Sequence, residues 1–461
     1  MQIIGTIFFA AESHLLLDGY YLNHEVKEMK GGHTHIREVI ASGHEGAEFS
    51  IRGWIHRTRS SGSIVFAVIR DQSGIMQCTV KKSDVPPADF EGAEKALIES
   101  SVECTGVLMR DKRAPGGFEL RATRYNVISF AEPFPITANQ SEPFLLDNRH
   151  LWIRSREQIA VMKVKETLLQ GARNWFKENS FIEVTPPILT TNACEGGTTL
   201  FSLKYFGQEA YLSQSAQMYL EAMSVSLENV FAVTPSFRAE KSRTPRHLTE
   251  YWHMEAEEAW VDNEGNMRIQ EELISAIAAA IYRDRKEELE LLGRDPAQLK
   301  IVEPPFERMT YSKAIEVLGD KGKVLKWGDD LGTEEERSLT LEYDKPLFVT
   351  SYPKTLKAFY MKDNEEDSRT YSCADLLAPE GFGEIIGGSE RETDYNKLVR
   401  RMEEQNIGIE PYRWYLDLRK YGSVTHSGFG MGIERVLRWI CKLEHIRDAT
   451  PFPRTPSRIY P

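Results

Sequence analysis

The sequence predicts a multidomain α+β protein, in which a small β-barrel domain precedes a larger domain of mixed strands and helices. A chain of 461 residues is too long for one ordinary domain. Short strand-like runs and turns fill residues 33–131, whereas long amphipathic stretches alternate with strand-like runs later in the chain. A segment rich in proline and acid, residues 132–146, lies between them. We therefore expect an extension over 1–32, a barrel domain over 33–131, a linker over 132–146 and a larger domain over 147–461.

Composition limits the kinds of partner that the chain can bind. The hydrophobic fraction of 41% is enough for substantial cores, and the net charge of -12 argues against polyanion binding by the whole surface. Any nucleic-acid site must therefore be a local basic patch. The five cysteines are far apart, without metal-ligand spacing, which indicates a reducing, cytoplasmic chain without a structural zinc: Cys78, Cys104, Cys194, Cys373 and Cys441.

The first 32 residues differ in pattern from the domains after them. Their apolar piece, residues 3–11, is too short to span a bilayer and lacks the basic residues that precede a secretory core. We expect a weakly ordered extension and no membrane association. A true start at Met29 is the alternative.

The barrel prediction depends on five strand-like runs. Residues 49–80 contain three of them, separated by polar and glycine turns, and residues 101–110 and 118–129 add two more after an expected helix over 88–100. Five strands with one helix are the content of an OB-fold, whose open face stacks single-stranded bases on aromatic side chains. Phe66 and Gln77 are candidates for base stacking and base-edge hydrogen bonds, and Arg52, Arg57 and Arg59 for phosphate contacts. A core phenylalanine and an exposed glutamine are the alternative.

The larger domain opens with a long amphipathic helix and a short strand that runs into Pro186 and Pro187. Proline cannot donate to a central ladder, so this strand ends there or lies at an edge, as at a subunit interface.

Residues 231–260 predict two strands joined by a basic loop that contains Lys241, Arg243, Arg246 and His247. Arg238 ends the first strand, and Glu240 follows two residues later on the same face. Such a pair suits a nucleotide, because the guanidinium grips a phosphate and the carboxylate accepts from an adenine amino group. A solvated hairpin with a surface ion pair is the alternative.

Two glycine-rich stretches add candidates. Glu384 and Arg391 flank Gly387 and Gly388, where an acid beside a glycine-lined turn can hold magnesium or ATP. Gly428, Gly430 and Gly432 alternate along an expected strand before Arg435, which predicts a flat slot for a planar base under the guanidinium. Residues 358–362 are expected to form a further apolar strand, and the insertion over about 262–344 is expected to contain structural residues only.

Together these pieces resemble the class II aminoacyl-tRNA synthetases of the aspartate, asparagine and lysine subgroup, over residues 33–461. The strand ending at Pro186 resembles the first family motif, FRAEKSRTPRHLTEYWHMEAE the second and GFGMGIER the third. The resemblance implies an antiparallel catalytic sheet flanked by helices, a homodimer, and amino-acid activation with ATP and Mg²⁺.

Within the subgroup the sequence favours asparagine. Aspartate enzymes carry a lysine three residues after the glutamine equivalent to Gln217, and this chain has Leu220 there. Loss of a buried cation disfavours a charged carboxylate, whereas a carboxamide needs no such partner. GEIIGGSERE and FPRTPSRIYP are similar to the archaeal asparaginyl enzymes, which implies L-asparagine and tRNA(Asn) as substrates. Pro245 and Glu390 depart from that pattern, where arginine and glutamine are usual.

The resemblance also implies the roles of individual residues. Arg238 and Arg435 would be catalytic, with Arg238 at the α-phosphate, Tyr251 and Arg435 around the adenine, and Glu384 as the magnesium ligand. The implied ATP site is Arg238, Glu240, Arg246, His247, Tyr251, Glu384, Gly432 and Arg435. The implied amino-acid site is Glu195, Gln217, Leu220, Glu255 and Arg391, and the implied tRNA contacts are Arg52, Phe66 and Gln77.

Other functions remain open at this level. One is an aspartyl enzyme, with or without discrimination between the two amino acids, and a second is an asparagine-making paralogue, a type that lacks the anticodon-like domain. A third is an RNA-binding protein with an inactive core, against which the intact set of Arg238, Glu384 and Arg435 argues.

Overall fold

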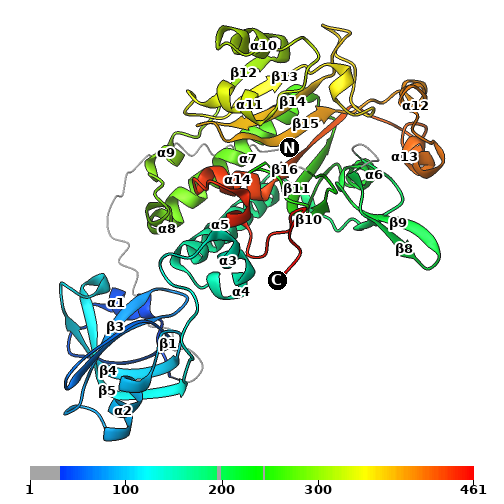
Figure 1. The fold of residues 1–461 in the computed structure, drawn as a ribbon. Coiled ribbons are helices and arrows are strands. Elements are labelled where there is room, and N and C mark those ends of the chain that lie inside the picture. Colours follow the sequence, from blue (N-terminus) through cyan, green and yellow to red (C-terminus); the bar gives the residue numbers. More distant parts are fainter. Residues whose placement is uncertain (1–31, 195–198, 242–243) are drawn as a thin grey trace, which may run out of the picture. The chain divides into compact units, whose positions relative to one another are not determined.

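The computed structural model describes residues 32–194, 199–241 and 244–461 (Figure 1). The candidate residue Glu195, the loop residue Arg243 and nearly all of the expected extension lie outside these ranges. The chain divides into two compact units between Gln140 and Ser141, within the expected linker.

The first unit is a closed five-stranded barrel with the order β1-β2-β3-β5-β4. Its strands are β1 (Glu48–Ser61), β2 (Ile64–Arg70), β3 (Ile75–Lys81), β4 (Ser101–Arg110) and β5 (Phe118–Ser129). Every second residue of β2 is buried in the barrel, from Val65 through Ala67 to Ile69. Helix α2 (Pro87–Lys95) begins with a proline and ends five residues before the predicted end, and α1 (Ile36–Ser42) was not predicted. The OB-fold prediction is confirmed.

The second unit contains an eight-stranded sheet with the order β12-β13-β14-β15-β16-β11-β10-β6. Its central strands pair antiparallel, and the edge pairs β12/β13 and β10/β6 are parallel. The strands are β6 (Ile182–Glu183), β10 (Asn229–Phe237), β11 (Glu250–Ala259), β12 (Glu307–Thr310), β13 (Leu347–Thr350), β14 (Cys373–Ala378), β15 (Gly383–Glu390) and β16 (His426–Gly432). The strand before Pro186 therefore lies at an edge, as the proline requires.

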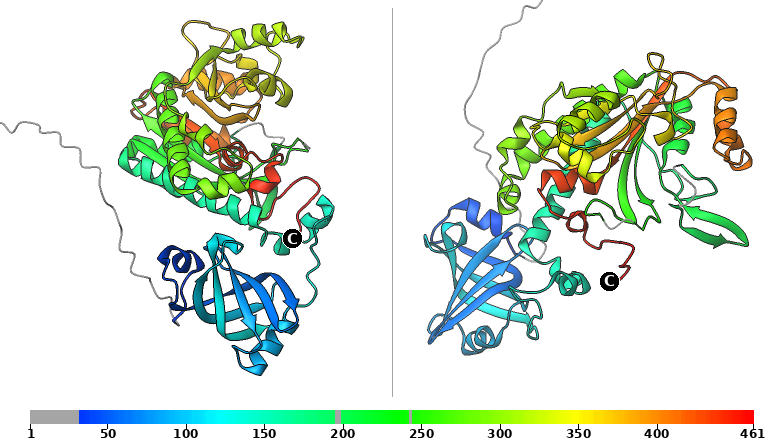
Figure 2. Two further views of the ribbon diagram at one scale, coloured as in Figure 1. Left: turned by 90° about the vertical axis from the view of Figure 1, so that its left-hand side faces the viewer. Right: turned by 45° about the horizontal axis from the view of Figure 1, so that its top comes forward.

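Helices α5 (Arg156–Glu178) and α7 (Asn263–Asp284) cover one face of this sheet and lie side by side (Figure 2). Phe176 of α5 stacks on Phe231 of β10 with 4.2 Å between ring centroids. Leu273, Ile274 and Ile277 of α7 belong to the same core. The first part of the expected insertion is thus an integral layer of the domain.

The remaining elements surround the sheet. Helix α6 (Gln217–Leu227) precedes β10, and β7 (Leu189–Thr190), β8 (Ser202–Tyr205) and β9 (Gln208–Leu212) form a small sheet. The later helices are α8 (Lys286–Leu291), α9 (Ala297–Lys300), α10 (Tyr311–Asp320), α11 (Thr333–Thr340), α12 (Tyr395–Glu404), α13 (Arg413–Asp417) and α14 (Ile433–Ile440), and α3 (Glu142–Asp147) and α4 (Arg149–Trp152) open the unit. Over the described ranges, no helix is long and apolar enough to cross a membrane.

One strand prediction is wrong. Residues 358–362 form no strand and make only an isolated bridge, from Met361 to Arg391. Phe359 and Tyr360 instead pack in a cluster with Tyr412 and Tyr415. An apolar run can be buried by side-chain packing without joining a ladder, and the pattern alone does not separate the two cases.

Candidate active site

A cavity of about 530 Å³ opens on the face of the large sheet opposite α5 and α7. Successive side chains of β11 point to opposite faces of the sheet. Met254 and Ala256 point into the core beneath, whereas Tyr251, His253, Glu255 and Glu257 line the cavity. Every residue of the implied ATP site lines this cavity.

The phosphate-binding candidates lie just beyond the end of β10. This strand ends at Phe237, so Arg238 and Glu240 begin the loop rather than ending the strand as predicted. Their side chains approach to 4.0 Å, and the Arg238 guanidinium carbon lies 6.0 Å from the centre of the Tyr251 ring. The predicted pair is therefore brought together with an aromatic surface suited to a base.

Arg246 is more constrained than the sequence suggested. It is buried against Glu336 of α11, which accepts from both terminal guanidinium nitrogens, one of them at 3.1 Å. The backbone N–H of Glu384 also donates to Glu336, at 2.7 Å. The expectation of structural residues only in the insertion is therefore incomplete, because α11 supplies a carboxylate that contacts two residues of the cavity.

His247 is neutral at pH 7 in this setting. Burial, followed by the charges of Arg435 and Arg246, lowers the pKa of the imidazole to about 4. Its Nδ1 contacts the Thr244 hydroxyl. A neutral imidazole among cations can donate to a phosphate without carrying a charge of its own.

Glu384 and Asp375 form a carboxylate pair around Gly387. Burial alone would raise the pKa of Glu384, but Arg435 and Lys357 lower it to about 2. Arg435 Nη1 lies 3.0 Å from Glu384, and Lys357 Nζ lies 2.5 Å from Asp375. A Cβ at Gly387 would meet Asp375 at 3.5 Å and Glu384 at 3.6 Å, so the glycine leaves space between two oxygen donors. Hard cations such as Mg²⁺ take such donors.

Asp375 was missed because it is the one charged residue in an otherwise apolar strand. It lies on β14 opposite Gly387, and a β-bulge between Leu376 and Leu377 turns Glu384 onto the same face. Nothing in the sequence pattern marks that bulge.

The amino-acid candidates line the other part of the cavity, apart from Glu195, which the structure does not describe. Glu255 accepts from the backbone N–H of Ala216 at 2.8 Å and contacts the Ser215 hydroxyl. The carboxylate thus stabilises the amino-terminal end of α6. Gln217 is buried, and its amide donates to Glu221 at 3.0 Å.

Arg391 is already engaged with an acid that the sequence reasoning did not name. Its Nε and Nη2 donate to Glu257 at 2.8 and 2.9 Å, and its Nη1 donates to Ser389 at 2.8 Å. Burial lowers the pKa of Arg391, but Glu257 more than offsets this, so the guanidinium stays charged. Glu257 could have been found from the period of two on its strand, two residues after Glu255.

Leu220 lines the cavity but is mainly a core residue. It is fully buried in an apolar cluster with Ala216, Val230 and Ala232. A lysine at this position would have to bury its stem among apolar neighbours, which is costly unless its ammonium finds a partner. A Leu220→Lys change would therefore disturb the packing of this cluster as well as add a charge to the cavity.

The glycine strand forms a narrower slot than predicted. A Cβ at Gly428 would lie 2.0 Å from the Glu257 carboxylate, and one at Gly430 would lie 2.5 Å from His253. Two of the three glycines therefore make room for protein side chains. Gly430 and Gly432 both line the cavity, and a Cβ at Gly432 would meet the Arg435 side chain at 3.3 Å, so the base slot beneath Arg435 stays a prediction.

On the barrel, Phe66 and Gln77 lie on the outer face. Arg59, opposite Phe66 on β1, holds its guanidinium carbon 4.8 Å from the ring centre, and Gln77 donates to Glu119 at 3.2 Å. Phe66 is half-buried and belongs to no core cluster, so the core alternative is wrong. Arg52 is exposed and lies on β1 seven residues before Arg59, where it is opposite Glu103 of β4. Arg59, and not Arg52, is the residue opposite Phe66.

Comparison with known families agrees with both units. The model described as tRNA synthetases class II (D, K and N) matches residues 141–456, and the OB-fold nucleic acid binding domain matches residues 49–128. The chain therefore belongs to the class II tRNA synthetases of this group.

Similar proteins indicate which member of this synthetase group the chain resembles. The asparagine--tRNA ligase of Thermoplasma acidophilum is 50% identical over 92% of this chain and 99% of its own length, and that of Thermococcus kodakarensis is 53% identical over 90% and 97%. The crystal structure of Pyrococcus horikoshii asparaginyl-tRNA synthetase with asparaginyl-adenylate matches with a TM-score of 0.90 and 51% identity, over 93% of this chain and 99% of that one. The chain belongs to the asparagine--tRNA ligase family. An aspartyl enzyme from Entamoeba histolytica is 25% identical, so the aspartyl alternative is not favoured.

Proposed function

We propose that the protein activates L-asparagine with ATP to asparaginyl-adenylate and transfers the asparaginyl group to tRNA(Asn). The observation that carries the choice of amino acid is the bidentate pair of Arg391 and Glu257. Because Glu257 already neutralises this guanidinium, a second carboxylate on the substrate would lack a counter-charge. A carboxamide can accept from the remaining guanidinium hydrogens and donate to a nearby acid.

The residues divide the chemistry between binding and charge stabilisation. The asparagine carboxylate attacks the α-phosphorus of ATP, and pyrophosphate leaves. Arg238 offsets the charge that grows on the α-phosphate, and Tyr251 and Arg435 hold the adenine between them. A terminal tRNA hydroxyl then attacks the adenylate carbonyl, and AMP leaves. No protein side chain forms a covalent bond, so catalysis comes from positioning and charge.

Magnesium fits the pair of Glu384 and Asp375. Both carboxylates border the space at Gly387, and both are held by cations, Arg435 and Lys357, that can turn toward phosphate oxygens instead. Bound there, Mg²⁺ would offset part of the phosphate charge. Asp375 is thus proposed as a second metal ligand beside the predicted one, Glu384.

We also propose a homodimer, because the edge strand β6 has one side that is not paired with another described strand. Among the strands that the structure describes, β6 pairs with β10 alone, and Ile182 on it is 45% exposed. Ile188 and Leu189, a few residues on, are also exposed. An edge strand with exposed apolar side chains is a ready surface for another copy of the chain.

The barrel is proposed to bind the anticodon through Phe66, Gln77 and the neighbouring arginines, with Arg52 at a more distant phosphate. A cytoplasmic location is proposed because all five cysteines are buried thiols rather than disulfides, as in a reducing compartment.

The deciding experiment measures pyrophosphate exchange with asparagine and aspartate side by side, followed by charging of tRNA(Asn). We expect a preference for asparagine of at least ~100-fold in kcat/KM, or roughly 3 kcal/mol. Equal use of the two amino acids would overturn the argument from Arg391 and Glu257. Exchange without charging would retain the activation step and reject the transfer step.

A further inference from the structure

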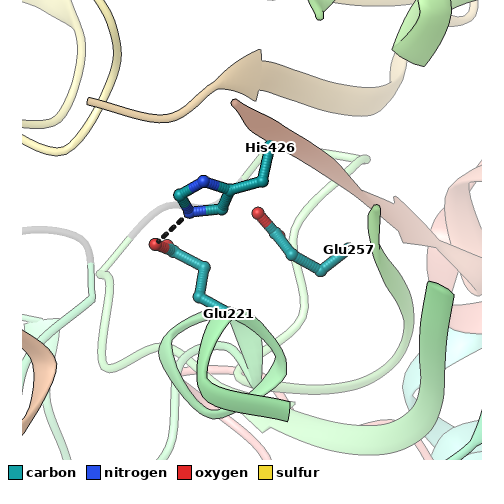
Figure 3. A group of neighbouring side chains, drawn as sticks. All are labelled: Glu221, Glu257 and His426. Atoms are coloured by element: carbon teal, nitrogen blue, oxygen red, sulfur yellow. Dashed lines mark hydrogen bonds and ion pairs between the residues drawn. The ribbon is translucent and has the colours of Figure 1, made fainter. Parts of the chain in front are cut away.

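A buried cluster of charges adjoins the part of the cavity lined by Gln217, Glu257 and Arg391, which we call the side-chain end because it would face the side chain of the amino acid. At its centre is Glu221 of α6, which is fully buried. Its carboxylate accepts from Arg419 at 2.6 Å, from the Tyr415 hydroxyl at 2.9 Å and from the amide of Gln217 at 3.0 Å. Figure 3 shows Glu221 and His426 facing one another, with Glu257 beside them, and the His426 Nε2 lies 3.1 Å from Glu221.

The grouping of Glu221, Glu257 and His426 resembles a metal site, since their ligand atoms lie within 4.8 Å of one another. The arginines around it argue against a metal. Arg419 occupies Glu221, and Arg391 occupies Glu257 through two hydrogen bonds. A metal ion would lie against two guanidinium cations that already satisfy these oxygens.

The cluster is instead a balanced set of charges. Burial alone would raise the pKa of Glu221, but Arg419 and His426 more than offset it and lower the pKa, so this carboxylate is ionised. Burial also raises the pKa of Glu257, to about 7, against the opposing charge of Arg391, so above that pH two carboxylates face two guanidinium groups. The His426 Nδ1 lies 2.8 Å from the Val424 carbonyl, which fixes the orientation of the ring.

This balance determines how much charge Arg391 presents to the cavity. Its Nε lies 4.0 Å from Glu221 but 2.8 Å from Glu257. Because Arg419 satisfies Glu221, Arg391 is left in its paired geometry on Glu257. If Glu221 lost its charge, two guanidinium groups would share a single carboxylate, and one uncompensated positive charge would remain in a low-dielectric region beside the substrate.

We propose that Glu221 is a positioning and specificity-determining residue, which keeps the side-chain end of the cavity electrically neutral and so makes it reject aspartate in favour of asparagine. The proposal rests on the placement of the asparagine side chain against Arg391 under the proposed function. Glu221 acts through Arg391 and Gln217, both of which line the cavity.

The test is Glu221→Gln, which keeps the size of the side chain and removes its charge. The measurement is kcat/KM in pyrophosphate exchange for each amino acid. We expect the preference for asparagine to fall by about tenfold or more, with an increase in the absolute kcat/KM for aspartate, because the uncompensated positive charge now attracts the substrate carboxylate. A merely structural role would lower both values together and leave their ratio unchanged, which would overturn the proposal.

Two further variants keep the test decisive. Glu221→Gln combined with Arg419→Gln removes one charge of each sign, and it should restore the preference even where the single variant folds poorly. Failure of the folded double variant to restore the ratio contradicts the charge-balance argument. The matched control is Glu271→Gln on α7, also a buried carboxylate paired with an arginine, Arg308, which should leave the ratio unchanged.

Failure of the proposed function gives a different result. If the unmodified protein prefers neither amino acid, the function itself is wrong. If Arg391→Lys leaves the ratio unchanged, the side chain of the substrate is not at Arg391. If Arg391→Lys changes the ratio and Glu221→Gln does not, the role of Glu221 alone is rejected.

Discussion

At the scale of single residues, the site is a set of charges whose partners decide what each charge can do. Arg238 and Arg435 both line the cavity with Tyr251. Arg435 lies 3.0 Å from Glu384, whereas Arg238 lies 4.0 Å from Glu240. Both guanidinium groups thus lie in the same cavity as the aromatic ring, where a guanidinium can offset a charge that develops on a phosphate.

We therefore predict that Arg238→Ala loses adenylate formation while the protein stays folded. Removal of a transition-state charge contact costs roughly 3 kcal/mol or more, which is at least ~100-fold in kcat/KM. Asparagine-dependent pyrophosphate exchange measures the loss, and circular dichroism checks the fold. Arg283→Ala on the exposed side of α7 is the control and should leave exchange intact. Near-normal exchange in Arg238→Ala would contradict the assignment.

His247 offers a prediction that depends on pH. Its pKa is lowered to about 4 by burial and by nearby cations, so in the free protein it stays neutral until the pH falls through about 4. Bound ATP adds negative charge nearby, which favours the charged imidazole and raises this pKa. ATP binding should then take up a proton at pH values between the free and bound pKa. Histidine NMR titration with and without ATP, assigned with His247→Gln, measures the shift, and an unchanged pKa at saturating ATP would place His247 away from the phosphates.

At the scale of elements, helix α11 and the barrel strand β2 each present a side chain with a role beyond the packing of that element. Glu336 joins α11 to Arg246 of the loop after β10 and to the backbone of Glu384 on β15. Three separate elements are thus held together at one carboxylate.

We predict that Glu336→Gln raises the KM for ATP by about tenfold. The loss of a charge-assisted hydrogen bond costs roughly 1.5 kcal/mol or more, and Arg246 is then held less firmly for phosphate binding. The KM for asparagine should change little, because Glu336 contacts Arg246 and Glu384, which belong to the implied ATP site. Glu335→Gln, one residue before on α11 and 3.6 Å from Lys323, is the control. Equal changes in both KM values would indicate general destabilisation instead.

On the barrel, Phe66→Ala should weaken tRNA charging and spare tRNA-independent exchange. Loss of a base–aromatic stack costs about 1–3 kcal/mol, and Phe66 lies on the outer face rather than in the core. Val68→Ala, two residues along the same face, removes apolar area without removing a ring. If Phe66→Ala impaired exchange as strongly as charging, the ring would be stabilising the fold rather than binding tRNA.

At the scale of the whole molecule, the sheet places the site on one face and leaves the β6 edge open among the described strands. We predict that Ile182→Asp at this edge shifts a dimer toward monomer, because a charge in an apolar interface must be desolvated. Analytical ultracentrifugation measures the shift. Val324→Asp, at an apolar residue that is 98% exposed, is the control. A monomer in the unmodified protein, or an unchanged dimer in Ile182→Asp, would reject β6 as the interface.

The sequence by itself determined the fold class and a set of charged and polar residues that line the cavity. The alternation of apolar and polar residues along β2 and β11 predicted strands with one buried and one exposed face. This two-residue period can be read from neighbouring positions without knowing the fold. For the same reason the basic loop, the glycine strand and the candidates of the implied ATP site could be named from the chain alone, since each lies within a short motif.

Only the tertiary structure decided which charge pairs with which. Arg391 pairs with Glu257 at a separation of 134 residues, Arg419 with Glu221 at 198, and Arg246 with Glu336 at 90. Strand register brings Arg391 and Glu257 together, since Glu257 and Ser389 both pair with Gly428 of β16. The other two pairs join helices and loops that pack around the sheet, and no local pattern specifies these contacts. Because a buried charge takes its effect from its neighbours, the chain alone named the charged residues, and the fold decided how much of each charge the substrate meets.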